Sequence, residues 1–202
     1  MFFLFSQVVL MAACGCSSVL FFDTCSNGFY FEMEPADVYE DAFNISNQCP
    51  KCLIKSKDNK FLLLKEDQFQ AQNLPTTESG CSFNIQIYKN NELGGDKGRP
   101  VMLYATKDGK KMVVCCNEKE EICPVAMDLP NNIVEASHKA VFYLTDLKAS
   151  NMFLFESSVY QCKFLGFEPD EHRPFLSKLV LQEKDHDEVV DSCEITISNI
   201  KS

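Results

Sequence analysis

Short runs of apolar residues, each ended by polar turn residues, recur along most of this chain and limit the folds open to it. The segments Phe83 to Ile87 and Cys193 to Ile197 alternate strictly between apolar and polar residues. That alternation is typical of a strand with one buried face. Asp108 and Gly109 stand between two apolar runs, which predicts a tight hairpin turn. The pattern as a whole predicts an all-β domain.

Most of the chain after residue 51 can be assigned to strands from these patterns. Turn signals such as Gly94-Gly95 and Pro169-Asp170 separate the segments, and Asn132 to Ser137 favours a short helical turn. The predicted strands are Cys52 to Lys55, Phe61 to Lys65, Phe83 to Lys89, Val101 to Thr106, Lys111 to Cys116, Ile122 to Met127, Ala140 to Thr145, Met152 to Glu156, Lys163 to Phe167, Leu176 to Leu181 and Glu194 to Ser198.

So many short strands with regular turn signals indicate a sandwich or a barrel, and periodicity does not choose between the two. The apolar positions of the strands supply the predicted core. It consists of Phe83, Ile85, Ile87, Val101, Leu103, Val113, Phe142, Leu144, Phe153, Phe155, Phe164, Leu179 and Ile197.

Length and charge narrow the class of protein. A chain of 202 residues with 46% hydrophobic content fits one ordinary domain plus an extension. Its net charge of −10 argues against nucleic acid or an anionic membrane as partner, because both attract Lys and Arg. A basic protein surface is the more natural complement, and we expect no membrane insertion.

The charge is unevenly distributed. Residues 1–41 contain no Lys or Arg and carry six of the 29 acidic residues, which marks a boundary near Asp41. We therefore expect an acidic segment at 1–41 and a folded domain at 42–202. Phe2 to Ala13 is apolar enough to imitate the core of a signal peptide but lacks a positive start, so the residues alone leave a signal peptide open. The run is too short for a membrane-spanning helix of about 20 residues.

The cysteine pattern favours synthesis in a reducing compartment. Eleven is an odd number, and Cys115-Cys116 are neighbours without a regular framework, unlike a secreted disulfide scaffold. Cys49 and Cys52 form a CxxC motif, which can bind zinc or act as a redox pair. No second CxxC is present in the sequence. We therefore interpret the two as incidental thiols near a strand and expect no metal or cofactor.

Signatures of catalysis are absent from the sequence. It contains no glycine-rich phosphate loop and no GxSxG elbow. His138, His172 and His186 stand among polar residues, which predicts exposed loops. A Cys-His or Ser-His pair that meets only in space stays open, but we do not expect an enzyme. The carboxylate-rich run Glu183 to Asp191 is most simply a solvated loop, with a receptor-facing role as the alternative.

Several short motifs in the sequence resemble those of the interleukin-1 cytokine family. They are Phe155-Glu156-Ser157-Ser158 with Tyr160 and Phe164-Leu165, Cys116-Asn117-Glu118-Lys119, and Met127 to Ile133. The resemblance covers about Leu53 to Ile200. It departs at Cys162-Lys163, where a small or acidic residue is more usual, and at Pro174-Phe175, where the family often has a charged residue.

The resemblance implies a β-trefoil, in which twelve strands form three four-strand units and a six-stranded barrel is capped by hairpins. The units would be Cys52 to Tyr88, Val101 to Tyr143 and Met152 to Ile197. No sequence repeat between the three is evident, so this symmetry comes from the resemblance alone.

The same resemblance implies a function by recognition. A precursor without a signal peptide, made in the cytosol with a short acidic propiece, would be trimmed by an inflammatory caspase and released. It would then bind a two-chain immunoglobulin-like receptor as a monomer, with a soluble binding protein as a further partner. The cut is expected after Asp41 and before Ala42, with Asp37 as the second choice. An acidic linker that no protease uses is the alternative.

Four charged residues stand where the resemblance implies receptor contacts: Asp58, Lys89, Lys97 and Lys119. The alternative for each residue is an ordinary solvent-exposed charge that makes no receptor contact.

Other classes of protein would require other features in the sequence or the structure. A trefoil growth factor would need a basic heparin patch, and a ricin-type lectin would need aromatic sugar platforms commonly built on Trp, of which the chain has none. An enzyme or inhibitor on an unrelated β-barrel would need a deep polar pocket with converging acid and base groups. Another ligand or an antagonist of the same family also remains open.

Overall fold

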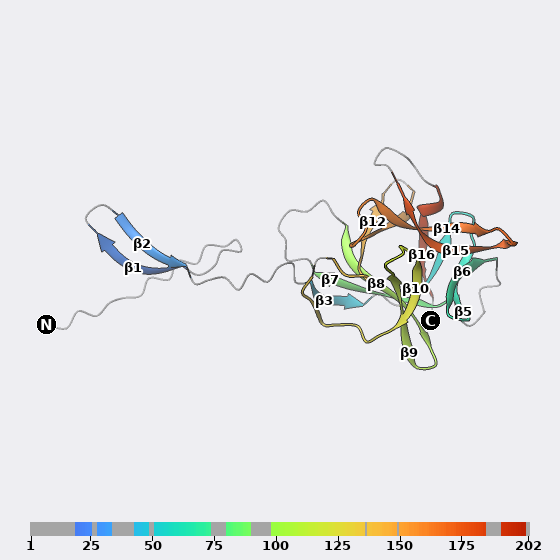
Figure 1. Cartoon of the computed structure of the whole chain (residues 1–202), viewed down its shortest axis with the longest axis horizontal. Helices are drawn as coiled ribbons and strands as arrows, with labels where there is room; N and C mark the ends of the chain where they lie inside the picture. The colour runs from blue at the N-terminus through green and yellow to red at the C-terminus, as the bar shows by residue number, and fades with distance from the viewer. Residues whose placement is uncertain are drawn as a thin grey trace. The chain divides into compact units, whose positions relative to one another are not determined.

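The computed structural model describes residues 19–25, 28–33, 43–48, 51–73, 80–89, 98–135, 137–148, 150–184 and 191–200. The chain divides into two units, residues 1–40 and residues 41–202. In the first unit, strand β1 (Val19–Cys25) pairs antiparallel with β2 (Gly28–Met33), with a register shift between Phe21 and Asp23 (Figure 1). This unit is therefore a single β-hairpin in its described part.

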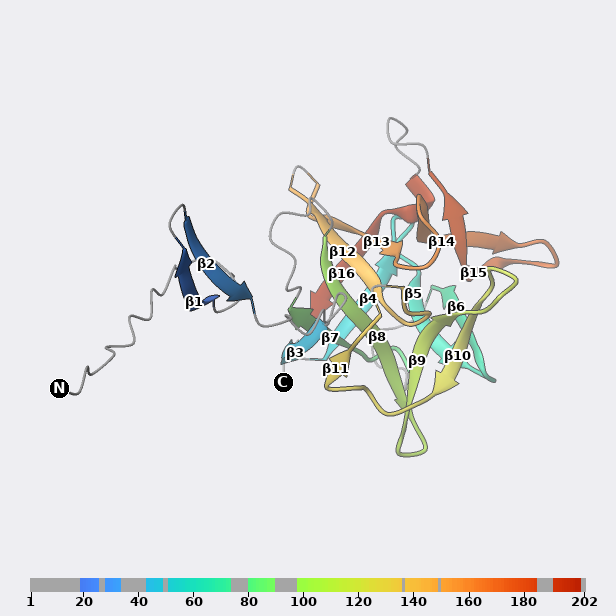
Figure 2. The ribbon, with the colours of Figure 1, turned by 60° about the vertical axis from the view of Figure 1, so that its left-hand side comes forward.

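Six strands of the second unit close into a barrel (Figures 1 and 2). In ring order they are β4 (Cys52–Ser56), β7 (Phe83–Lys89), β8 (Arg99–Lys107), β12 (Phe142–Leu147), β13 (Met152–Ser157) and β16 (Ile195–Asn199). Each strand pairs antiparallel with the next, and β16 pairs back to β4. Closure leaves the ring without an unpaired edge that another chain could extend.

Three hairpins complete the fold. They are β5 (Phe61–Lys65) with β6 (Gln68–Gln72), β9 (Lys110–Cys116) with β10 (Ile122–Ala126), and β14 (Lys163–Asp170) with β15 (Arg173–Glu183). Strands β6, β10 and β15 contact one another, so the hairpins meet. Each hairpin lies in sequence between two barrel strands, which gives three four-strand units. The fold is a β-trefoil, as predicted.

Two short strands and one 3-10 helix lie outside this threefold plan. Strand β3 (Phe43–Gln48) pairs with β7, and β11 (Asn132–Ile133) pairs with β3. The 3-10 helix η1 (Asp191–Cys193) precedes β16. In the part of the chain that is described, no helix is long and apolar enough to cross a membrane.

Strand β8 separates two cores because its side chains alternate between its faces. Val101, Leu103 and Ala105 belong to the main cluster, which also holds the Phe rings of β7, β12 and β13. Met102 and Tyr104 face a second cluster, where β3 and β11 contribute. In that second cluster the rings of Phe43 and Tyr143 meet edge to face, with 6.4 Å between centroids. The N-terminal strand of the domain is thus part of its packing.

Most of the predicted core is confirmed. Nine of the thirteen residues are buried: Phe83, Ile85, Val101, Leu103, Val113, Phe142, Leu144, Phe155 and Leu179. Four are only half-buried: Ile87, Phe153 and Ile197, which pack against the main cluster, and Phe164. These four lie on barrel or hairpin strands, as predicted, but their side chains stay partly exposed at the surface.

Turn positions adopt the backbone that their sequence favours. Asp108 and Gly109 have φ of 51° and 75°, the double positive φ of a type I′ hairpin turn, which confirms that prediction. Cys162 has φ of 60° in the turn before β14, a conformation that residues other than glycine adopt at a cost. Strands β13 and β14 still form on either side of it.

Two expectations are wrong. Asn132 to Ser137 does not begin as a helical turn: Asn132 and Ile133 form β11, because Ile133 is buried in the second cluster and its backbone pairs with Phe43. His138 is half-buried rather than exposed, since it lies beside the buried Ala140 at the start of β12. Local polarity predicts neither result, because tertiary packing decides both.

Candidate functional site

Asp58 lies in the turn between β4 and β5, where its side chain is exposed. The turn is closed by Ser56, whose amide donates to the carbonyl of Lys60 at 3.0 Å and whose carbonyl accepts from Asn59 at 3.0 Å. Asn59 has a positive φ of 61°. The backbone under Asp58 is therefore fixed, and its carboxylate is free to face solvent.

Lys57, next to Asp58, forms ion pairs with residues near the C-terminal end of the domain's sequence. Its Nζ contacts the carboxylate of Asp191 and lies 3.1 Å from Glu194 Oε2. These hydrogen bonds, first to Asp191 and then to Glu194, raise the pKa of the Lys57 ammonium. Glu194 is 8% exposed, so Lys57 supplies its counter-charge and ties the β4–β5 turn to η1.

Lys89 is exposed at the end of β7, opposite Asn44 of β3. Lys97, the predicted cleavage pair Asp41 and Ala42, and the second choice Asp37 lie outside the described residues. Their assignments stay predictions.

Lys119 lies in the turn between β9 and β10, which the side chain of Asn117 organises. Asn117 Oδ1 accepts hydrogen bonds from the amides of Lys119 and Glu121, both at 2.9 Å. Its Nδ2 donates to Glu121 Oε2 at 2.8 Å. Asparagine favours this arrangement because its short amide can replace backbone partners in a turn. Glu120 adopts a positive φ of 63° within it.

The third trefoil unit anchors this turn from outside. The hydroxyl of Tyr160 donates to the carbonyl of Asn117 at 2.8 Å, and Lys163 Nζ contacts the carboxylate of Glu120. Tyr160 follows the Phe155-Glu156-Ser157-Ser158 segment that the sequence analysis singled out. The exposed Lys119 is therefore carried on a turn with a defined position.

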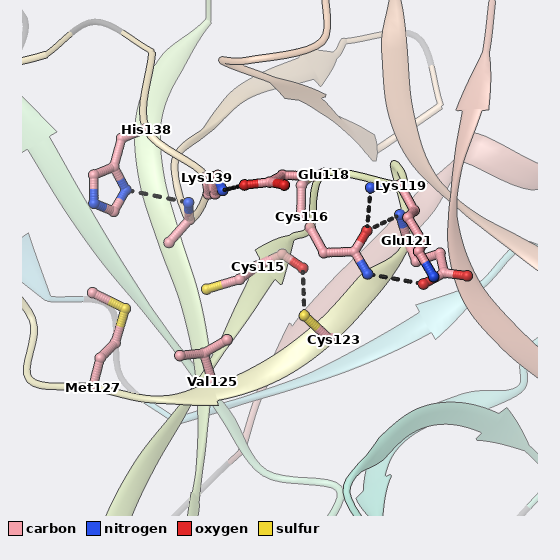
Figure 3. A pocket seen from close by; sticks show the side chains of 12 residues that line it. Cys115, Cys116, Glu118, Lys119, Glu121, Cys123, Val125, Met127, His138 and Lys139 are labelled. Atoms are coloured by element: carbon pink, nitrogen blue, oxygen red, sulfur yellow. Dashed lines mark hydrogen bonds and ion pairs between the residues drawn. The ribbon is translucent and has the colours of Figure 1, made fainter.

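A groove of about 580 Å³ opens beside this turn, and Figure 3 shows its lining side chains. Val125 and Met127 of β10 and its continuation supply apolar surface. Charged groups stand at its upper side, where Lys139 Nζ lies 3.3 Å from Glu118 Oε1. The lining residues are Cys115, Cys116, Asn117, Glu118, Lys119, Glu121, Cys123, Val125, Met127, His138, Lys139 and Ala140.

The thiols of the groove are poor nucleophiles. Burial raises the pKa of Cys115 to about 12 and that of Cys116 to about 11. Cys116 Sγ lies 3.8 Å from Ser157 Oγ in the main core. A catalytic cysteine needs a thiolate at neutral pH, so these mostly protonated thiols are unsuited to nucleophilic catalysis.

His138 does not act as a base toward these thiols. Its Nδ1 accepts a hydrogen bond from the amide of Ala140 at 3.2 Å, and burial lowers the pKa of the imidazole. Ser158 holds the same segment, since its hydroxyl accepts from the His138 amide at 3.1 Å and donates to the His138 carbonyl at 2.8 Å. The histidine is therefore a structural part of the groove wall.

The described residues contain no group of His, Cys, Asp and Glu that could hold a metal ion. Cys52 of the CxxC motif is fully buried and donates to the carbonyl of Phe83 at 3.5 Å, whereas Cys49 lies outside the described residues. The geometry of the groove suits contact with another surface: an apolar floor, a charged rim and a rigid turn beside it.

Three of the four receptor-contact candidates are described, and each lies on a different connection or strand end. Among them, Lys119 lines the groove. The sequence analysis did not identify the groove itself, nor the Lys57 ion pairs. The groove forms where β9 and β10 pack against residues 138–140, a proximity that no local pattern reports.

Comparisons with known proteins show which proteins this chain is similar to. No protein-family model matches the sequence. Mouse interleukin-18 is 26% identical over 162 residues, which cover 78% of this chain and 80% of the mouse protein. Rat interleukin-18 is 28% identical over 147 residues, which cover 68% of this chain and 70% of the rat protein.

Solved structures share the trefoil. Chicken interleukin-1 beta superposes with a TM-score of 0.59 at 18% identity, covering 78% of this chain and 99% of the chicken chain. A single-residue variant of the chicken protein gives a TM-score of 0.60 at 18% identity, with the same coverage. At such identity the structural likeness shows the fold alone, and the sequence matches to interleukin-18 carry the relationship.

Proposed function

We propose that this chain is a member of the interleukin-1 family of cytokines, a pro-inflammatory, interleukin-18-like ligand activated from a precursor. The observation that carries the proposal is the alignment with mouse interleukin-18 over 78% of the chain. Its relatives are cytokines rather than enzymes, and a cytokine acts by binding receptors. We propose an interleukin-18-receptor-like pair of immunoglobulin-like chains as the partner, with a soluble binding protein as a competitor for the same ligand.

The receptor would contact exposed charges on fixed connections. Asp58, Lys89 and Lys119 are exposed, and the turns beneath Asp58 and Lys119 are braced by hydrogen bonds. A rigid turn supports binding because little conformational freedom is lost on association. Lys97 completes the proposed set. Binding energy in such interfaces concentrates in a few residues, so we expect these four to contribute unequally.

Processing would separate an acidic propiece, residues 1–41, from a cytokine domain, residues 42–202. Support comes from the division of the chain between residues 40 and 41 and from the six acids without a base in residues 1–41. We propose that an inflammatory caspase cuts after Asp41, with Asp37 as the second choice. A caspase requires Asp before the cut, and the small Ala42 after it suits such a protease.

The start of β3 bears on this cleavage. Phe43 is 1% exposed and pairs with Ile133, so a cut after Asp41 would leave Ala42 as a single residue before a packed strand. The trefoil would then keep all of its strands after processing. The precursor would be cytoplasmic, and the mature monomer would act outside the cell without a conventional signal peptide.

The test treats the full-length chain with an inflammatory caspase, sequences the new N-terminus and applies the product to receptor-bearing cells. We expect Ala42 as the first residue and a signalling response that the uncut chain does not give. An N-terminus at Val38 would move the site to Asp37. Binding without signalling would identify an antagonist, and absence of both binding and cleavage would reject the proposal.

A further inference from the structure

Two cysteines of the groove lie opposite each other on the two strands of the β9–β10 hairpin. Cys115 and Cys123 are partners in the antiparallel register. Along the same ladder, the amide of Asn117 donates to Glu121 at 2.9 Å and the amide of Met127 donates to Lys111 at 3.2 Å. Hydrogen-bonded pairs recur at every second residue, so the cysteine pair is of this class, with Cα atoms about 5.5 Å apart. Disulfides join Cα atoms about 4.4 to 6.8 Å apart.

The two side chains also lie on the same face of the hairpin. Cys115 is a buried member of the second cluster, and Cys123 packs against that cluster. Cys123 Sγ donates to the carbonyl oxygen of Cys115 at 3.7 Å. Figure 3 marks this interaction with a dashed line. Cys116 points to the opposite face, into the main cluster. Of the two neighbouring thiols of β9, Cys115 is therefore the one that shares a face with Cys123.

The two thiols differ in how accessible they are to a reagent in solution. Cys123 is half-buried and lines both the 580 Å³ groove and a neighbouring groove of about 440 Å³ on the side of β15. Cys115 is 6% exposed. A small reagent would meet Cys123 first and would leave Cys115 as the second, sheltered thiol.

We propose that Cys115 and Cys123 form a redox modification site, a cross-strand disulfide made when the protein meets a low-molecular-weight disulfide such as oxidised glutathione. Both are free thiols in the structure. The Cys123 thiolate attacks one sulfur of the small disulfide, whose S–S bond breaks and releases one small thiol. The Cys115 thiolate then attacks the Cys123 sulfur and releases the second small thiol. The protein loses two protons and two electrons, and the small disulfide gains both.

Burial raises the pKa of Cys115 to about 12, and burial, followed by the nearby charge of Glu121, also raises the pKa of Cys123. Both thiolates are therefore scarce at neutral pH, so formation of the link should speed up as the pH rises. The finished link would join the two strands whose turn carries Lys119. This inference goes beyond the proposed function, since no step involves a receptor or a protease.

The sequence provides a direct assay on the full-length chain. Trypsin cleaves after Lys111, Lys119 and Lys139, which separates Cys115 (peptide 112–119) from Cys123 (peptide 120–139). The protein is incubated with oxidised glutathione, its remaining thiols are alkylated, and the digest is analysed by mass spectrometry. We expect the two peptides joined and two hydrogens lighter than their sum, with fragmentation that places the link on Cys115. The two peptides found unlinked would overturn the proposal, as would a link on Cys116.

Matched variants separate the two neighbouring thiols. Cys123→Ser should abolish the linked peptide, and Cys116→Ser should keep it at the wild-type yield. Loss of the link in Cys116→Ser, or its persistence in Cys123→Ser, would contradict the assignment. Because Cys115 is buried, its replacement by Ala can also disturb packing, and the wild-type fragmentation assigns the sulfur independently of that variant.

Discussion

The barrel interior and the β9–β10 turn are stabilised by different physical means. The barrel closes around apolar rings such as Phe83, Phe142 and Phe155, each with no measurable exposure. The turn has no apolar core of its own: Asn117 and Tyr160 hold it with hydrogen bonds, and ion pairs surround it. Burial of apolar side chains therefore determines the fold here, whereas a small network of hydrogen bonds and ion pairs determines the position of the proposed contact residue Lys119.

The largest expected effect comes from breaking the barrel. Phe155→Ala removes a fully buried ring of β13 and should lower the free energy of unfolding by about 3 to 5 kcal/mol. Phe175→Ala is the matched control, because that ring is 66% exposed and its loss should change stability little. Chemical denaturation of both variants measures the difference. Equal losses would show that the barrel core is not the main source of stability.

A smaller effect is expected at the turn. Tyr160→Phe keeps the ring and removes the 2.8 Å hydrogen bond to the Asn117 carbonyl, which should cost about 0.5 to 1.5 kcal/mol. Hydrogen exchange at the amides of Lys119 and Glu121 should rise more than exchange in β13. Unchanged protection of those amides would mean that the Asn117 side chain holds the turn without Tyr160.

The smallest expected effect is a pH dependence of folding stability that arises from His138 in the groove wall. Burial lowers the pKa of His138 from the ordinary 6.5, so the folded state favours the neutral ring. The stability that this histidine contributes is present above pH 6.5 and is lost as pH falls, because the unfolded chain then binds more protons. His138→Gln should flatten the fall in stability between neutral and mildly acidic pH. His172→Gln, at an exposed position, should keep the wild-type slope.

Apolar runs and alternation predicted most of the strands, because strands with a buried face carry that pattern, whereas the barrel was implied by the family resemblance alone. The pattern missed β6, whose segment Gln68–Gln72 is mostly glutamine, because Gln70 and Ala71 are buried between neighbouring strands rather than by a recognisable pattern. It also missed β3, since Phe43 is buried only through contacts with Ile133 and Tyr143, far away in the sequence.

The candidate site was less predictable than the fold. Lys119 was proposed through the family resemblance, and the structure places it at the edge of a groove. The groove could not be predicted, because it depends on the register that aligns Cys115 with Cys123 and on the packing of residues 138–140 against them. Such contacts join different segments of the chain, and no local sequence pattern indicates that these segments meet.

The central claim is that the barrel supports the fold while the braced turn presents a receptor contact. Its most direct test is the affinity of the caspase-processed protein for the receptor pair, compared between Lys119→Glu and Lys110→Glu. Lys110 is exposed at the start of β9 and is not among the proposed contacts. We expect unchanged melting temperatures in both, a loss of affinity of about tenfold or more for Lys119→Glu, equal to about 1.4 kcal/mol, and none for Lys110→Glu. Equal affinities for the two variants and the wild type would contradict the claim.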